Sequence, residues 1–144
     1  MGDTIFKPVL KFKDEKQLEQ YLKYWQHILH LDHWCIKAGF ADEIVDKGNN
    51  PLEGMNEVIF DNCEAYITIS REERKSHMKH CEEHTLVHEL LHCLLPIIDY
   101  TDPSVEEVAY ANAMHQHVEM LAKSFIMTCY DVDIDWFMEG GADD

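Results

Sequence analysis

Apolar side chains recur every three or four positions between Asp14 and Leu29, a spacing that predicts an amphipathic helix with one buried face. That face comprises Leu18, Tyr21, Leu22, Trp25, Ile28 and Leu29. The next apolar segment, Trp34 to Phe40, predicts a short strand. Ala41 to Met55 combines charged residues with glycine, asparagine and proline, so we expect a loop there.

Two β-rich runs, Glu57 to Phe60 and Ala65 to Ile69, are separated only by Asp61, Asn62 and Cys63. This pattern predicts a β-hairpin. Ser70 and Glu73 then have the spacing of a capping box, which predicts that a short helix follows the hairpin.

The longest apolar run extends from Leu86 to Ile98 and predicts a buried helix from about Lys79 to Leu95, with Pro96 weakening its end. We expect a turn over Asp99 to Asp102. Ser104 and Glu107 form a second capping box, which predicts a long helix to about Tyr130. The glycine-rich acidic segment Glu139 to Asp144 is typical of a flexible tail.

Composition excludes several classes of partner. The chain has 144 residues, 46% of them hydrophobic, which suits one buried core. A formal charge of −16 would repel nucleic acid and anionic membranes. Its five cysteines are widely spaced and contain no CxxC pair, and we see neither a signal peptide nor a membrane-spanning run. We therefore expect a cytoplasmic protein with reduced thiols.

The sequence His88-Glu89-Leu90-Leu91-His92 is an HExxH motif inside the predicted buried helix. Residues four apart lie on one face of a helix, so the two imidazoles are suited to bind one metal ion. The glutamate next to the first histidine is then placed to act on a metal-bound water. Because 10 of the 144 residues are histidine, the motif gains weight mainly from the elements around it.

The order of these elements, a strand, the HExxH helix and a long helix, resembles that of zincin metallopeptidases with a thermolysin-like active-site layout. Within that class, the chain is similar to the small zinc metallopeptidases of phages and prophages. The similarity extends from about Leu18 to Phe125. It rests on Leu22 to Trp25, Leu29 to Trp34, Ile67 to Ile69, Thr85 to His92 and Val118 to Ala122.

The resemblance implies an α+β, zincin-like fold in which a small antiparallel or mixed sheet packs against the HExxH helix and the following long helix. Residues 1–138 would form a single metallopeptidase domain, and residues 139–144 the acidic flexible tail. If the chain is encoded by a phage, its location would be the cytosol of the host.

A catalytic zinc ion usually has three protein ligands, so a third is expected on the long helix. His115 lies at the edge of that helix's apolar face, and Glu119 follows one turn later. In the thermolysin-like group, a ligand on this helix is followed four residues later by an acid that hydrogen-bonds a zinc histidine. His115 as the ligand and Glu119 as the acid that hydrogen-bonds a zinc histidine have this spacing. The family usually has an acid where this chain has His115, so the alternative is Glu119 as ligand with His115 or His117 nearby.

The function expected from these residues is zinc-dependent hydrolysis of a peptide or protein substrate, with one Zn²⁺ per chain and Glu89 as general base. In the resemblance, Ala65 to Ile69 is the edge strand of the cleft, and Ile67 and Ile69 would hold an extended peptide by main-chain pairing. Tyr100, Tyr110 and His117 are candidate proton donors. The alternative is a non-catalytic zinc-binding structural or interaction module that retains the fold; a non-proteolytic zinc hydrolase is a weaker option.

A second group of metal-binding residue types, His77, His80, Cys81 and His84, precedes the motif. If the helix extends back that far, His80, His84, His88 and His92 form one stripe at four-residue spacing. We expect His80 and His84 to be solvated residues at the start of the helix.

Overall fold

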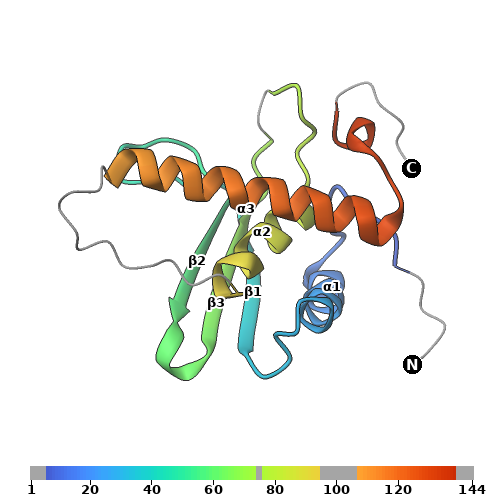
Figure 1. The fold of residues 1–144 in the computed structure, drawn as a ribbon, viewed down its shortest axis with the longest axis horizontal. Helices are drawn as coiled ribbons and strands as arrows, with labels where there is room; N and C mark the ends of the chain where they lie inside the picture. The colour runs from blue at the N-terminus through green and yellow to red at the C-terminus, as the bar shows by residue number, and fades with distance from the viewer. Residues whose placement is uncertain (1–5, 74–75, 95–106, 139–144) are drawn as a thin grey trace.

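A computed structural model describes residues 6–73, 76–94 and 107–138, and for residues 107–114 the backbone alone (Figure 1). Within these ranges the fold is α+β, as predicted. In chain order the elements are α1 (Glu15–Ile28), β1 (Cys35–Ala41), β2 (Gly54–Ile59), the 3-10 turn η1 (Phe60–Asn62), β3 (Glu64–Ser70), α2 (Glu82–Leu94), α3 (Glu107–Tyr130) and the 3-10 turn η2 (Ile134–Phe137).

The three strands form a mixed sheet in the order β1-β3-β2, with β1 parallel and β2 antiparallel to β3. The predicted hairpin is confirmed as β2 and β3. The prediction that Ala65 to Ile69 is an edge strand is wrong, because β3 pairs with a strand on both sides. Ile67, for example, pairs with Ala38 and Asn56.

Ile67 and Ile69 therefore do not offer their main chain to a peptide. Their side chains are completely buried in the core. Among the described strands, the outer edge next to α2 belongs to β2. The candidate substrate-binding strand accordingly moves from β3 to β2.

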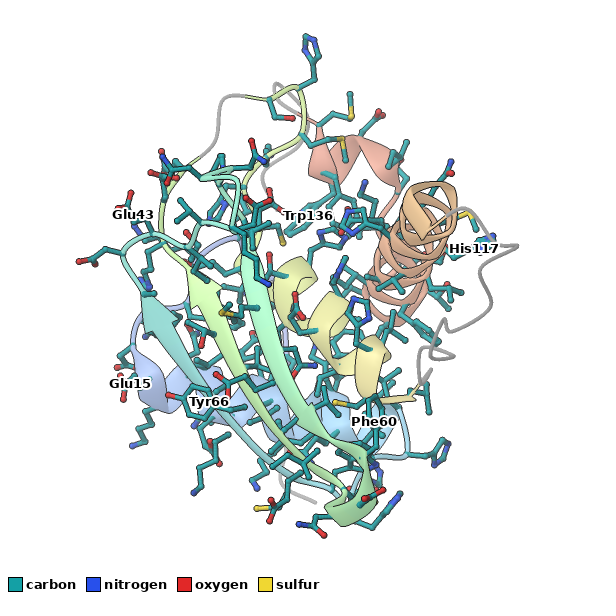
Figure 2. All side chains as sticks on the ribbon, turned by 90° about the vertical axis from the view of Figure 1, so that its left-hand side faces the viewer. Glu15, Glu43, Phe60, Tyr66, His117 and Trp136 are labelled. Atoms are coloured by element: carbon teal, nitrogen blue, oxygen red, sulfur yellow. The ribbon has the colours of Figure 1, made fainter. Side chains whose placement is uncertain are left out.

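Helix α2 is buried along most of its length because it lies between the sheet and α3 (Figure 2). Leu86, Val87 and Leu90 are completely buried, and every polar residue of the same helix except His92 is at most 7% exposed. Such burial fixes α2 against both neighbours, since a well-packed interior leaves little room for movement.

Two buried glutamates fix the start of α2. The Glu83 carboxylate accepts hydrogen bonds from the Trp25 Nε1 at 2.7 Å, the Tyr130 hydroxyl at 2.6 Å and the Val9 backbone N–H at 2.8 Å. Glu82 accepts one from the Phe12 N–H at 2.8 Å. Negative charge at a helix N-terminus also interacts favourably with the positive end of the helix dipole. These contacts join α1, α3 and the N-terminal segment to the helix that carries HExxH.

The local predictions have mixed outcomes. The first helix is confirmed, and the Asp14 side chain caps it by accepting from the Gln17 N–H at 2.9 Å. The prediction of a short helix after Ser70 is wrong over residues 71–73, which are not helical. The Ser70 hydroxyl instead accepts a hydrogen bond from the Glu72 N–H. Pro96, the turn at 99–102, Ser104 and the tail at 139–144 lie outside the described residues.

None of the five cysteines forms a disulfide. Across the ranges that the structure describes, no helix combines the length and the apolar character needed to cross a membrane.

Candidate metal centre

The two histidines of the motif face one another across one turn of α2. The Nε2 atoms of His88 and His92 are 3.3 Å apart, and their ring centroids are 5.0 Å apart. Two nitrogens that bind one zinc ion tetrahedrally at about 2.0–2.1 Å would be about 3.3–3.4 Å apart. The pair therefore has the separation of two ligands on one ion, a consequence of the four-residue spacing on a regular helix.

Glu119 contacts the other side of the His88 ring. Its Oε1 accepts a hydrogen bond from His88 Nδ1 at 2.5 Å. Burial raises the pKa of Glu119, but the hydrogen bond with His88 and the charges of His84, His88 and Lys123 outweigh it and lower that pKa to about 2. An ionised carboxylate at Nδ1 holds the proton there and leaves the Nε2 lone pair directed toward His92.

His84 shares the same carboxylate. Its Nε2 lies 3.6 Å from Glu119 Oε2, and its ring packs against Phe137 with centroids 5.8 Å apart. Burial lowers the pKa of His84, partly offset by the charge of Glu119. Sequence reasoning missed this role, although the four-residue spacing of His84, His88 and His92 already placed them on one helix face.

The prediction that His80 and His84 are solvated is wrong. His84 is 6% exposed, and the ring nitrogens of His80 are buried with no hydrogen-bond partner in the described structure. Since α2 begins at Glu82, His80 precedes the helix and the predicted stripe of four histidines contains three on α2. Packing against the N-terminal segment and η2 covers this end of the helix.

The candidate general base, Glu89, is 7% exposed. Burial raises its pKa to about 7; the charge of His88 opposes this shift and that of Glu119 adds to it. The carboxylate faces Gly54 at the start of β2, where an added Cβ would lie 3.0 Å from Glu89 Oε2 and 2.5 Å from Thr85 Cγ2. The close approach of β2 to α2 thus depends on glycine at position 54, which the sequence interpretation assigned to a loop.

Asn56 joins the same strand to the helix by donating a hydrogen bond from Nδ2 to the Glu89 carbonyl at 2.8 Å. Sequence reasoning did not single out this residue. A side-chain amide two residues after Gly54 carries no motif that would have marked it.

The third ligand is the incomplete part of the centre. His115 is exposed, and its ring centroid lies 5.0 Å from that of His88. In the residues with described side chains, no three His, Cys, Asp or Glu come together as a group able to hold a metal ion. His115 as a ligand therefore stays a prediction. Glu119 lies at His88 Nδ1, the ring nitrogen opposite the one that faces His92, which favours its supporting role over the alternative of direct ligation.

Of the three candidate proton donors, only His117 has a described side chain, and it does not line the cleft. His117 is exposed on α3 and points away from the sheet (Figure 2). Tyr100 and the side chain of Tyr110 fall outside the described part of the chain.

A cleft of about 780 Å³ lies between β2 and the two helices and brings the predicted metal and catalytic residues together. It is lined by His88, Glu89, His92, His115 and Glu119, and by Gly54 to Asn56 of β2. Burial lowers the pKa of His92 to about 4, with the charges of His88 and His115 acting in the same direction. At neutral pH this imidazole is uncharged, the form that binds metal.

The donor set fits zinc, which takes imidazole nitrogens and carboxylate oxygens and tolerates an open position in catalytic sites. Comparisons of the chain with protein-family models, with curated proteins and with solved structures found no match.

Proposed function

We propose that this chain is a zinc-dependent metallopeptidase whose active site is the cleft between β2, α2 and α3. The observation that carries the proposal is the 3.3 Å separation of the His88 and His92 Nε2 atoms at the wall of this cleft. The buried Glu89, next to His88 in the sequence, supplies the base that hydrolysis requires. The Glu119 carboxylate at His88 Nδ1 supplies the group that supports this ligand.

His88 and His92 would hold the zinc ion, with His115 as the third ligand after adjustment of its side chain. When bound, zinc polarises a substrate carbonyl and makes water a stronger nucleophile at neutral pH. Glu89 accepts the proton of the attacking water and returns it to the leaving amine. Its pKa near neutrality suits both transfers, because a base that holds a proton too tightly or too weakly performs one of them poorly. Glu119 keeps the His88 ring oriented.

An extended peptide would pair with the outer edge of β2, which lines the cleft through Gly54, Met55 and Asn56. Main-chain pairing holds a substrate largely independently of its sequence. This arrangement retains the peptide or protein substrate predicted from the sequence and places it on a different strand.

The test combines metal analysis with peptide hydrolysis. Purified chain loaded with zinc should hold about one ion per chain and cleave an unstructured protein such as casein. The Glu89→Gln variant should retain zinc and lose cleavage by a factor of at least about 10². Glu57→Gln, on the exposed face of β2, is the matched control and should cleave normally.

Absence of zinc binding in the parent chain would overturn the proposal. Stoichiometric zinc without cleavage of any peptide library would instead indicate the alternative, a zinc-binding module without catalysis.

A further inference from the structure

Strand β2 carries two exposed apolar side chains on the face of the sheet that is turned away from α2. Met55 and Ile59 are 44% and 53% exposed, and they alternate with residues that face the interior. Gly54 and Asn56 lie against α2, and Val58 packs against the core. Because successive side chains of a strand point to opposite faces, Met55 and Ile59 both lie on the outer face.

The neighbouring strand β3 leaves these two side chains uncovered. In the sheet register both lie opposite polar residues of β3, Thr68 and Glu64. Tyr66 lies on the same strand and the same outer face (Figure 2). Its hydroxyl is 3.1 Å from the position that a Cβ on Gly39 of β1 would occupy. Tyr66 therefore leans toward β1, and the apolar groups of Met55 and Ile59 stay accessible.

The spacing of the two residues suits an extended peptide on the outer edge of β2. An edge strand offers its main-chain groups to an added strand, and β2 is at the edge of the described sheet. Such a peptide directs every second side chain to the outer face. Two of its side chains four residues apart, a separation of about 13 Å, would then lie beside Met55 and Ile59. Directly opposite side chains on paired strands are in contact.

A peptide fits this surface better than a second copy of the chain does. Two copies would repel one another, since each has a formal charge of −16. A stable dimer also buries about 800 Å² on each partner, far more than two side chains offer. Met55 in addition lines the cleft, so the outer face of β2 continues the proposed substrate site.

We propose that Met55 and Ile59 form an apolar strip that selects extended peptides with two apolar side chains four residues apart. This inference rests on the proposed function, because it takes the substrate to be a peptide paired with β2. Glu89 faces Gly54, so the bond to be cleaved lies near Met55. Ile59 contacts the substrate about four residues away and determines specificity without touching the reacting atoms.

Equilibrium binding tests the inference without relying on turnover. The Glu89→Gln chain, metal-free and zinc-loaded, is titrated by NMR with three acetylated and amidated peptides. The first is Thr-Leu-Thr-Thr-Thr-Leu-Thr, the second its isomer Thr-Leu-Thr-Thr-Leu-Thr-Thr, and the third Thr-Leu-Thr-Thr-Thr-Thr-Thr. In the isomer the two leucines point to opposite faces of a strand. We expect the first peptide to bind about threefold more tightly than either of the others, the gain from one added cross-strand apolar pair.

Met55→Ser and Ile59→Ser should each abolish this preference, because one of the two apolar contacts is lost. Met120→Ser and Ile134→Ser are the matched controls, since these residues have the same side chains, are exposed to a similar extent and do not line the cleft. The inference is overturned if the three peptides bind equally, if none binds, or if a control variant loses the preference as Met55→Ser does.

The two proposals fail separately. If the chain binds no zinc but still prefers the peptide with leucines four residues apart, the apolar strip is supported and only the metallopeptidase proposal is refuted. If the zinc-loaded parent chain cleaves casein while the three peptides bind Glu89→Gln equally, only the inference about Met55 and Ile59 is refuted.

Discussion

The carboxylate of Glu119 joins two histidines of α2, accepting a hydrogen bond from His88 Nδ1 at 2.5 Å and lying 3.6 Å from His84 Nε2. Oε1 contacts the His88 ring and Oε2 lies near the His84 ring. The contact ties α3 to the face of α2 that carries the candidate metal ligands. The orientation of His88 therefore depends on a residue 31 positions later in the chain.

Removal of this carboxylate should weaken metal binding without abolishing it. Glu119→Gln should lower zinc affinity by about 10- to 100-fold, because the His88 tautomer is no longer fixed. His115→Ala, which removes a predicted ligand, should cause a larger loss. Competition with a chromophoric chelator measures both affinities, and circular dichroism checks that α2 and α3 remain folded.

A larger loss of zinc affinity at Glu119 than at His115 would change the ligand assignment. If His115→Ala keeps full zinc occupancy while Glu119→Ala loses it, Glu119 binds the metal directly. Met120→Ala is the control on the same helix, because Met120 is 58% exposed and outside the cleft.

His84 should act on the metal through Glu119. In His84→Gln, the carboxylate loses one of its two imidazole contacts, and we expect zinc affinity to fall about three- to tenfold, less than in Glu119→Gln. In the double variant His84→Gln/Glu119→Gln, the two losses should not add, because both act through one carboxylate. Additive losses would show that His84 contributes independently. His33→Gln, at an exposed histidine that does not line the cleft, controls for loss of a histidine as such.

The sequence predicted α1, β1, the hairpin, α2 and α3, because each is marked by local periodicity or a cap. It did not predict the strand order. Ala65, Ile67 and Ile69 alternate with exposed residues as on any strand with one buried face, and this pattern is the same at the centre and at the edge of a sheet. Which strand pairs on both sides depends on β1, which is distant in sequence.

The HExxH pair was predictable because four-residue spacing has a fixed meaning on a helix. The environments of His84 and Gly54 were not predictable, since they are set by tertiary packing. His84 is buried by Phe137, 53 residues later, and Gly54 is defined by the approach of Thr85 and Glu89. Neither contact can be recognised from the local sequence.

Gly54→Ala should destabilise the fold and displace Glu89, the candidate general base. The added methyl group would meet Thr85 Cγ2 at 2.5 Å and Glu89 Oε2 at 3.0 Å, so either these two side chains or β2 must shift. Overpacking of this kind costs about 1–3 kcal/mol of unfolding free energy. Thr85→Ser removes the methyl group in closest contact, and Gly54→Ala in that background should cost less. Urea denaturation of the four proteins measures the coupling. Gly48→Ala in the exposed loop is the control, and an equal loss at both glycines would contradict the packing argument.

Glu83 should make the stability of the chain depend on pH in an unusual direction. Burial raises the pKa of this fully buried carboxyl to about 7, against the hydrogen bonds of Tyr130, Trp25 and Val9, which lower it. Between its ordinary value of 4.5 and about 7, the unfolded chain releases a proton that the folded chain retains. This group's contribution to stability is therefore complete below pH 4.5 and falls as pH rises, by about 3 kcal/mol at most.

His92, whose pKa is lowered to about 4, acts in the opposite direction over part of this window, so the comparison must be a difference between variants. The unfolding free energy of the parent minus that of Glu83→Gln, measured in urea from pH 4.5 to 7.5, should decrease with pH. A difference that rises with pH would show that Glu83 is ionised in the folded chain throughout this range.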